Sequence, residues 1–165
     1  MTGVYWGRFN PPHKGHLFII KTLIKEVDTL IIAIGSAEIK NTKRNPFDGN
    51  ERKIMMKVYL KENKLPIRRI KIITDPDGKS FSSGIKNLFR LCGKFDVIYT
   101  DKKTIIDLIS NKVKIKKIKR KVRVSSTQIR DAIAKDKSWE NLTGISVVKT
   151  IKGLNGINRI KKSYR

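Results

Sequence analysis

The two histidines of the chain, His13 and His16, stand three residues apart in the segment Gly7-Arg8-Phe9-Asn10-Pro11-Pro12-His13-Lys14-Gly15-His16. This segment follows a β-rich run and precedes a stretch with helical spacing, so we expect a strand to pass into a helix here. The first turn of such a helix offers unpaired N–H groups and a positive dipole end to an anion. Imidazoles that the dipole keeps neutral can donate N–H groups to phosphate oxygens. The segment therefore predicts a phosphate clamp.

Two other interpretations of this histidine pair stay open. One histidine could belong to the turn and the other could face the helix, with no chemical role for either. The pair could also ligate a metal, because two histidines three apart on a helix can chelate. The segment contains no Cys, Asp or Glu that would complete a coordination sphere. We therefore expect no metal held by protein ligands.

A second segment with phosphate-binding chemistry is Ser125-Ser126-Thr127-Gln128-Ile129-Arg130. Ser125 followed by Gln128 predicts a capping box and hence the start of a helix. That helix would present free N–H groups, the hydroxyls of Ser126 and Thr127, and the Arg130 guanidinium one turn later. A capped surface helix without a ligand explains this segment alone equally well. Its occurrence together with the histidine segment favours a site for a polyphosphate.

The elements that must position these segments alternate between β-rich runs and stretches of helical spacing. This order predicts an α/β fold: an open, Rossmann-like parallel sheet with helices on both faces, whose ligands bind outside the carboxyl ends of the strands. We expect one domain over residues 1–150 and a basic C-terminal helix or tail over 151–165 that is packed on that domain, frayed, or docked on a partner. The expected strands are 4–9, 29–35, 69–74, 96–100 and one around 112–119. The expected helices cover 14–27 and 81–91, or begin at Asp48, Ser125 and Ser138.

The chain of 165 residues carries 38 Lys and Arg against 14 Asp and Glu, a formal net charge of +24. Such a charge attracts anions of every class. The most basic stretch, 112–123, alternates lysines with Val113 and Ile115, which predicts a half-buried strand; it contains no aromatic residue for base stacking, and this disfavours a nucleic-acid partner. The single cysteine, Cys92, excludes an internal disulfide, and no apolar run is long enough to span a membrane. We expect a cytoplasmic protein with no membrane partner.

Three segments of the chain together resemble one known family. The Gly-Arg-Phe block with His13 and His16 resembles the HxGH motif of the nucleotidyltransferases, in the form typical of archaeal-type nicotinamide-nucleotide adenylyltransferases. The segment Ile34-Gly35-Ser36-Ala37, with the later Arg44-Asn45-Pro46-Phe47 and Glu51-Arg52, is similar to the GSA…RxPF…ER region of that family. The segment 125–130 resembles its ISSTxxR motif. The matches occur in the family's order between residues 7 and 130.

The resemblance implies an enzyme of the nucleotidyltransferase fold that transfers AMP from ATP to nicotinamide mononucleotide and releases pyrophosphate, with Mg²⁺ bound alongside ATP. It implies four residues at the reacting phosphates: His13, His16, Arg8 and Arg130. The further ATP contacts that it implies are Gly7, Phe9, Arg44, Ser125, Ser126 and Thr127. The acceptor contacts that it implies are Phe81, Asp101, Gly35 and Ser36. It also implies a homo-oligomer.

Two departures from the family leave the acceptor open. Its archaeal-type members tend to have a Trp near the position of Phe81, and an S-G-N-P stretch where this chain has Thr100-Asp101-Lys102-Lys103. Phe81 is also in phase with Ile85 and Leu88, as a core residue would be, and Arg44 could be a solvated loop cation. One alternative is a related transferase acting on pantetheine phosphate, a flavin nucleotide or, with CTP, a polyol phosphate. A more distant alternative is a nucleic-acid-binding module without catalysis.

Overall fold

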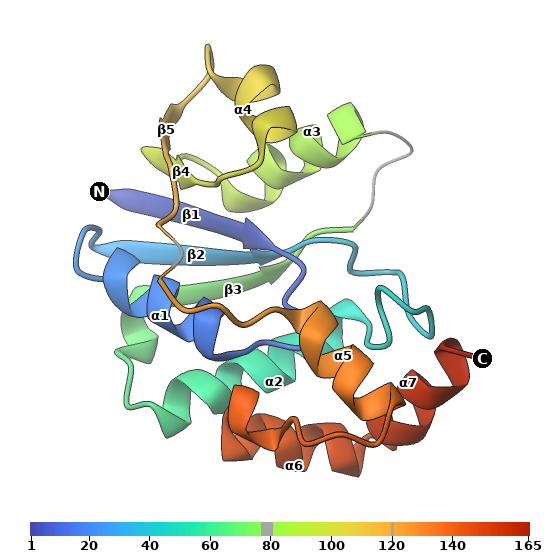
Figure 1. The fold of residues 1–165 in the computed structure, drawn as a ribbon. Coiled ribbons are helices and arrows are strands. Elements are labelled where there is room, and N and C mark those ends of the chain that lie inside the picture. The colour runs from blue at the N-terminus through green and yellow to red at the C-terminus, as the bar shows by residue number, and fades with distance from the viewer. Residues whose placement is uncertain (77–80, 120) are drawn as a thin grey trace.

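The computed structural model describes residues 1–76, 81–119 and 121–165, and for Phe81 only the backbone. Within these residues, five parallel strands form one sheet in the order β3-β2-β1-β4-β5, as Figure 1 shows. Their bounds are β1 Thr2–Gly7, β2 Thr29–Ile34, β3 Ile70–Thr74, β4 Val97–Tyr99 and β5 Lys114–Lys116. In register, Gly3 of the central strand pairs with Leu30 on one side and Val97 on the other.

Helices cover both faces of this sheet, so the predicted Rossmann-like α/β fold is confirmed (Figure 1). In chain order they are α1 Lys14–Leu23, α2 Gly49–Glu62, α3 Phe81–Cys92, α4 Lys103–Ile109, α5 Ser126–Ala134, α6 Ile145–Gly153 and α7 Gly156–Ser163. Two 3₁₀ turns, η1 Ile67–Arg69 and η2 Glu140–Leu142, complete the described elements. Among the described residues, no helix combines the length and the apolar character that crossing a bilayer requires.

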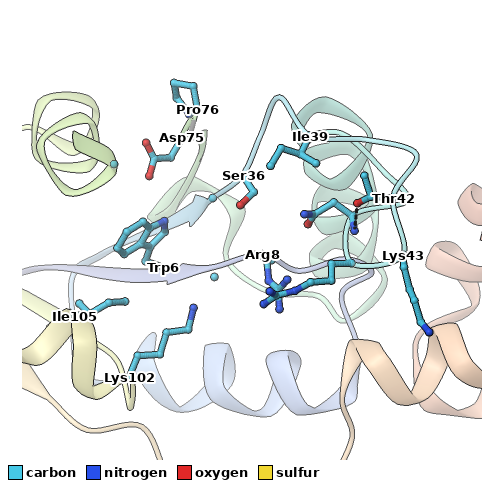
Figure 2. Close-up of a pocket in the computed structure, with 15 residues that line it drawn as sticks. Trp6, Arg8, Ser36, Ile39, Thr42, Lys43, Asp75, Pro76, Lys102 and Ile105 are labelled. Atoms are coloured by element: carbon cyan, nitrogen blue, oxygen red, sulfur yellow. Dashed lines mark hydrogen bonds between the residues drawn. The ribbon is translucent and has the colours of Figure 1, made fainter. Parts of the chain in front are cut away.

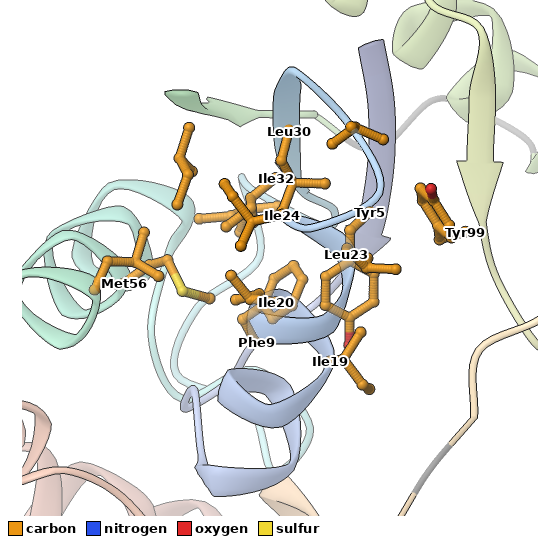
Figure 3. Packing of buried hydrophobic residues seen from close by; sticks show 14 of the residues in the cluster. Tyr5, Phe9, Ile19, Ile20, Leu23, Ile24, Leu30, Ile32, Met56 and Tyr99 are labelled. Atoms are coloured by element: carbon orange, nitrogen blue, oxygen red, sulfur yellow. The ribbon is translucent and has the colours of Figure 1, made fainter. Parts of the chain in front are cut away.

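Alternation along the strands divides the core between the two faces of the sheet. Tyr5 and Ile32 pack against α1 and α2, as Figure 3 shows, whereas their neighbours Val4 and Ile31 pack against α3 and α4. A third cluster lies outside the first layer, where α2 packs with α5, α6 and α7 around the fully buried Phe47. This third cluster gives α5, the helix of the second motif, a fixed place.

Several predicted element bounds were wrong, each for a local reason. The first strand ends at Gly7 and not at residue 9, because Phe9 adopts a left-handed backbone conformation with φ of 50°. The first helix ends at Leu23 and not at residue 27. No helix begins at Ser138; the chain forms a 3₁₀ turn there, and the next helix, α6, begins at Ile145. The helix α4 was not predicted.

Candidate functional site

The two segments with phosphate-binding chemistry line one pocket at the carboxyl ends of β1 and β4. The pocket has a volume of about 180 Å³. The predicted residues that line it are Gly7, Arg8, Phe9, His13, His16, Arg44, Asp101, Ser125, Ser126, Thr127 and Arg130. We refer to it as the phosphate pocket. Segments that are more than one hundred residues apart in the chain therefore face the same space, as a site for one polyphosphate requires.

His13 and His16 form a reciprocal cap at the start of α1. The Nδ1 atom of His13 accepts hydrogen bonds from the backbone N–H groups of Gly15 at 3.1 Å and His16 at 3.4 Å. The Nδ1 atom of His16 accepts one from the His13 N–H at 3.3 Å, and the two rings stack with their centroids 3.6 Å apart. A neutral imidazole that accepts at Nδ1 carries its proton at Nε2. Both rings are therefore set as Nε2–H donors, the form that a phosphate oxygen needs.

Gly15 lets the two segments approach each other. A Cβ atom at this position would lie 2.9 Å from Cε1 of His13 and 3.1 Å from the backbone oxygen of Val124, just before the second motif. The ring and the carbonyl leave no room for a side chain. The glycine of the histidine motif is thus explained by packing against the chain that enters α5.

The second motif is tied to the loop of the first by hydrogen bonds. The Arg130 Nη1 atom donates to the carbonyl oxygen of Asn10 at 2.7 Å, and the Ser126 hydroxyl donates to that of Pro11 at 2.9 Å. The Arg130 Nη2 atom also donates to the Thr127 hydroxyl at 3.1 Å. Ser125 caps α5 by accepting a hydrogen bond from the Gln128 N–H at 3.1 Å, so the predicted helix start is confirmed, but Gln128 does not return the bond that the predicted capping box requires. These bonds fix the distance between the two walls of the pocket.

Three guanidinium groups gather at the pocket. Burial lowers the pKa of Arg8, and repulsion from Arg44 and Arg130 lowers it further. Burial also lowers the pKa of Arg130, which is 4% exposed and whose Nε atom has no hydrogen-bond partner. Partly desolvated cations that repel one another are stabilised when an anion arrives between them. The electrostatics of the pocket therefore favour a highly charged anion.

A larger pocket of about 640 Å³ adjoins the phosphate pocket. Trp6, Gly7, Arg8, Arg44 and Lys102 line both, so these residues form the boundary between the two spaces. Figure 2 shows the indole of Trp6 and the carboxylate of Asp75 on one side of the larger pocket, with Arg8 and Lys102 directed towards its centre. Its size lies in the range of cofactor and nucleotide sites.

The four residues predicted to contact an acceptor are placed differently. Gly35 and Ser36 line the larger pocket, whereas Asp101 lines the phosphate pocket. Gly35 is required by the close approach of Trp6, whose Nε1 atom would lie 2.8 Å from a Cβ atom there. The side chain of Phe81 lies outside the described part of the structure, so its prediction is not tested.

Sequence reasoning missed Trp6, Lys102 and Arg52. Trp6 could have been found, because its place at the end of a strand beside the histidine motif puts it at the ligand edge of the sheet. Arg52 is fully buried, and its guanidinium donates to the carbonyl oxygens of Arg8 at 2.6 Å, Gly35 at 2.8 Å and Ser36 at 2.6 Å. It therefore holds together the loops that follow β1 and β2. The family resemblance had singled out Glu51-Arg52, but sequence reasoning assigned this arginine no role, because local spacing does not distinguish a buried arginine from a solvated one.

The described residues do not favour a metal site built from side chains or a catalytic thiol. Among the described residues, no three histidine, cysteine, aspartate or glutamate side chains gather as a metal-binding group. Burial raises the pKa of the Cys92 thiol to about 12, and Asp75 adds to that shift. The thiol thus stays protonated near neutral pH and is a poor nucleophile.

Comparison with known protein families and sequences agrees with this geometry. Residues 4–132 match the model of a family described as cytidylyltransferase-like. A nicotinamide-nucleotide adenylyltransferase of Thermococcus sibiricus is 35% identical over 164 residues, covering 98% of this chain and 88% of that protein. A protein of the same name from Pyrobaculum arsenaticum is 36% identical, covering 96% of this chain and 92% of its own length.

A solved structure shows the same fold at low sequence identity. It is the crystal structure of a bifunctional NMN adenylyltransferase/ADP ribose pyrophosphatase from Francisella tularensis, complexed with AMP and a manganese ion. The TM-score is 0.81 at 18% identity, and the match covers 98% of this chain. This chain spans about half of that two-activity protein, 52% of its length.

Proposed function

Since this chain belongs to the family of nicotinamide-nucleotide adenylyltransferases, we propose that it transfers AMP from ATP to nicotinamide mononucleotide and forms NAD and pyrophosphate. The observation that carries this proposal is the phosphate pocket, where the histidine pair and the 125–130 segment meet. If the nucleotide were bound through one motif alone, the second motif would not need to line the same pocket. The larger pocket next to it supplies space for the second reactant.

The chemical step uses positioning and charge. An oxygen of the acceptor's 5′-phosphate attacks the α-phosphorus of ATP, a new P–O bond forms, and the bond to the oxygen bridging to the β-phosphorus breaks. Both reactants are anions, and negative charge gathers on non-bridging and leaving oxygens in the transition state. Donors and cations fixed around that charge lower the barrier, and holding the reactants in line contributes up to roughly 7–11 kcal/mol. The protein needs no covalent nucleophile.

Each group has a role that its position supports. The Nε2–H groups of His13 and His16 donate to oxygens of the ATP phosphates and stabilise charge at the α-phosphate. Arg8 and Arg44, at the boundary of the two pockets, neutralise phosphate oxygens, and Gly7 and Phe9 contribute backbone contacts. The members of the second motif that receive the departing pyrophosphate are Ser125, Ser126, Thr127 and Arg130. Because the boundary residues line both pockets, we assign the meeting point of the acceptor phosphate and ATP to them.

Mg²⁺ fits this site as part of the ATP substrate. The phosphate pocket is lined by donors and cations, with Asp101 as an acidic side chain, which suits a metal carried by phosphate oxygens and water rather than by a protein cage. The bound ion supplies charge neutralisation between the phosphates. The Francisella tularensis structure holds manganese together with AMP, which supports use of a divalent ion.

The acceptor base belongs in the larger pocket. Trp6 offers a flat aromatic face there, and Ser36 and Asp75 line the same space with polar groups. We keep the acceptor role that the family resemblance implied for Gly35 and Ser36, because both line the larger pocket, whereas Asp101 lines the phosphate pocket. A cytoplasmic location and a homo-oligomeric state stay predictions.

An acceptor screen tests the proposed function. The purified protein is given ATP and Mg²⁺ with nicotinamide mononucleotide, nicotinic acid mononucleotide, pantetheine phosphate or FMN, and with CTP and a polyol phosphate in a separate arm. We expect pyrophosphate release and a dinucleotide product with nicotinamide mononucleotide. Pyrophosphate release with a different acceptor alone would show that nicotinamide mononucleotide is not the substrate. No release with any pair, together with salt-sensitive binding to duplex DNA or RNA, would show that the protein is a nucleic-acid binder and not a transferase.

A further inference from the structure

The C-terminal helix α7 contacts both cationic arms of the phosphate pocket. One arm is the loop 41–47, whose tip carries Lys43 and Arg44; the other is α5, which carries Arg130. These arms belong to different parts of the sequence, and α7 follows both of them. We propose that α7 is a brace that sets the position of Arg44 and thereby the affinity for ATP; this deepens the proposed function and rests on it.

Arg159 of α7 holds the base of the loop with all of its guanidinium nitrogens. Its Nη1 and Nη2 atoms form a bidentate pair with Glu51 at 2.6 and 2.9 Å. Nη2 also donates to the carbonyl oxygen of Pro46 at 2.6 Å, and Nε donates to Oδ1 of Asn41 at 3.1 Å. The guanidinium lies over the ring of Phe47, 5.1 Å from its centroid. The two ends of the loop are thus fixed to one side chain.

The contact between Arg159 and Glu51 is largely shielded from solvent. The side chains of Arg159 and Glu51 are only 21% and 19% exposed, so solvent screens their pair weakly. Glu51 also accepts a hydrogen bond from the Asp48 N–H at 2.9 Å, which anchors it in the capping box of α2. A Cβ atom at Gly156 would lie 2.7 Å from the Phe47 ring, so the glycine at the start of α7 lets the helix approach the loop. Helix α7 therefore contacts the loop through a glutamate that α2 also anchors.

Tyr164, just after α7, joins the same helix to the second arm. Its hydroxyl donates to Oδ1 of Asp131 in α5 at 2.6 Å, and its ring receives the Nζ atom of Lys43 at 4.4 Å from the centroid. Lys43 and Asp131 are the sequence neighbours of Arg44 and Arg130. One aromatic side chain thus contacts both arms next to their arginines. Arg44 itself is exposed at the loop tip, so its position depends on how the loop is held.

The test compares Arg159→Ala, Arg159→Lys and Arg44→Ala in the full chain, with Lys162→Ala as the control for a charge lost from an exposed site on α7. We expect Arg159→Ala to raise the KM for ATP about tenfold while kcat changes less than about threefold, because binding and not chemistry is disturbed. Arg159→Lys restores the charge but not the bidentate geometry, so it should recover only part of the affinity. The control should match the unchanged protein.

A double-mutant cycle separates the brace from a general structural role. If Arg159 acts through Arg44, the double variant should bind ATP no worse than Arg44→Ala within about twofold. Fold-changes that multiply would overturn the proposal. Tyr164→Phe, which keeps the ring but removes the hydroxyl, provides a second cycle with Arg44→Ala if Arg159→Ala does not fold.

Hydrogen exchange without substrate separates failure of the brace from failure of the proposed function. The N–H groups of Thr42 and Asn45 are hydrogen-bonded within the loop. In Arg159→Ala these amides should exchange on the order of tenfold faster, with the strand β1 unchanged. Unchanged loop exchange and unchanged ATP affinity would overturn the brace even in an active enzyme. Faster exchange in a protein that transfers no nucleotide would retain the brace and reject the adenylyltransferase.

Discussion

His13 and His16 share one pocket but differ in what each does for the fold. His13 is 5% exposed and its Nδ1 atom caps two N–H groups of α1, whereas His16 accepts a single bond from the His13 N–H. Removing the His13 ring would therefore disturb the helix start together with the chemistry. His16 is the better residue for a test of catalysis alone.

His16→Ala should reduce turnover at least about tenfold, because a donor to the charged phosphates is lost. The thermal unfolding midpoint should stay close to that of the unchanged protein. Steady-state kinetics at saturating ATP and acceptor measure the first effect, and circular dichroism measures the second.

Lys25→Ala, on the exposed surface after α1, is the matched control and should have no effect on turnover. Unchanged turnover in His16→Ala would contradict the role assigned to that histidine. If the unfolding midpoint of His16→Ala falls together with its turnover, the lost turnover reflects a destabilised fold.

Among the elements, α6 begins where it does because of a side chain from another helix. Its N-cap, Gly144, offers no side-chain cap, and the free N–H groups of Ile145 and Ser146 donate to Glu62 at the end of α2, each at 3.0 Å. A carboxylate at a helix N-terminus also interacts favourably with the dipole. This contact explains the wrong expectation of a helix starting at Ser138, since a cap supplied from over eighty residues away leaves no local signal.

Glu62→Gln should lower the thermal unfolding midpoint at pH 7 by about 2–4 °C, because the charged cap is lost. Partial burial opposes the charge of Glu62, but hydrogen bonds from Ser146 and Ile145 outweigh it and lower the pKa from 4.5. A lowered pKa means that the stabilisation is fully present above pH 4.5 and is lost as the pH falls through the value in the folded protein. The difference between the two proteins should therefore shrink as the pH falls below 4.5.

Unfolding midpoints from pH 3 to 8 measure this effect. Glu38→Gln removes the same charge from the exposed loop after β2 and should leave the midpoint unchanged. A difference between Glu62→Gln and the unchanged protein that stays constant from pH 8 to pH 3 would show that the cap does not depend on charge.

Other elements show where sequence patterns suffice. The capping box of Asp48 and Glu51 and the cap of Ser125 were predicted correctly, because each depends on residues three apart in one helix. The helix α4 escaped prediction because its N-cap, Lys102, makes no side-chain cap and its seven residues include two adjacent β-branched isoleucines. Caps that depend on residues close in the chain could be predicted from the sequence, whereas a cap supplied by a distant residue could not.

At the scale of the whole molecule, the net charge of +24 should speed the encounter with ATP. We expect kcat/KM for ATP to fall about tenfold between low salt and 0.5 M sodium chloride, because salt screens long-range attraction. The turnover at saturating ATP should change little, since the bound reactants lie against partly buried cations. Initial rates over a series of chloride concentrations, with Mg²⁺ held constant, measure both quantities.

A salt series in which turnover falls in parallel with kcat/KM would contradict this view, because the ions would then act on the chemical step or on folding. Unfolding midpoints over the same series distinguish the last two. Chloride is the suitable anion, since sulfate and phosphate would compete for the site directly.

The sequence predicted the whole-molecule arrangement better than its details. The fold class followed from the alternation of β-rich runs with stretches of helical spacing, and the shared pocket followed from two motifs that each begin a helix. The boundary residues Trp6 and Lys102 were not assigned roles, because the sequence does not show how two pockets adjoin. The contacts of Arg159 with Asn41 and Glu51 join residues over one hundred positions apart, and only the folded chain reveals them.

The mutual repulsion of Arg8, Arg44 and Arg130 has a consequence for the protein at rest. When no nucleotide is bound, this repulsion lowers the stability of the folded chain, and the hydrogen bonds of the pocket offset it. A bound triphosphate screens the repulsion and attracts all three guanidinium groups, so ATP binding also stabilises the fold. ATP binding should therefore raise the thermal unfolding midpoint of the protein.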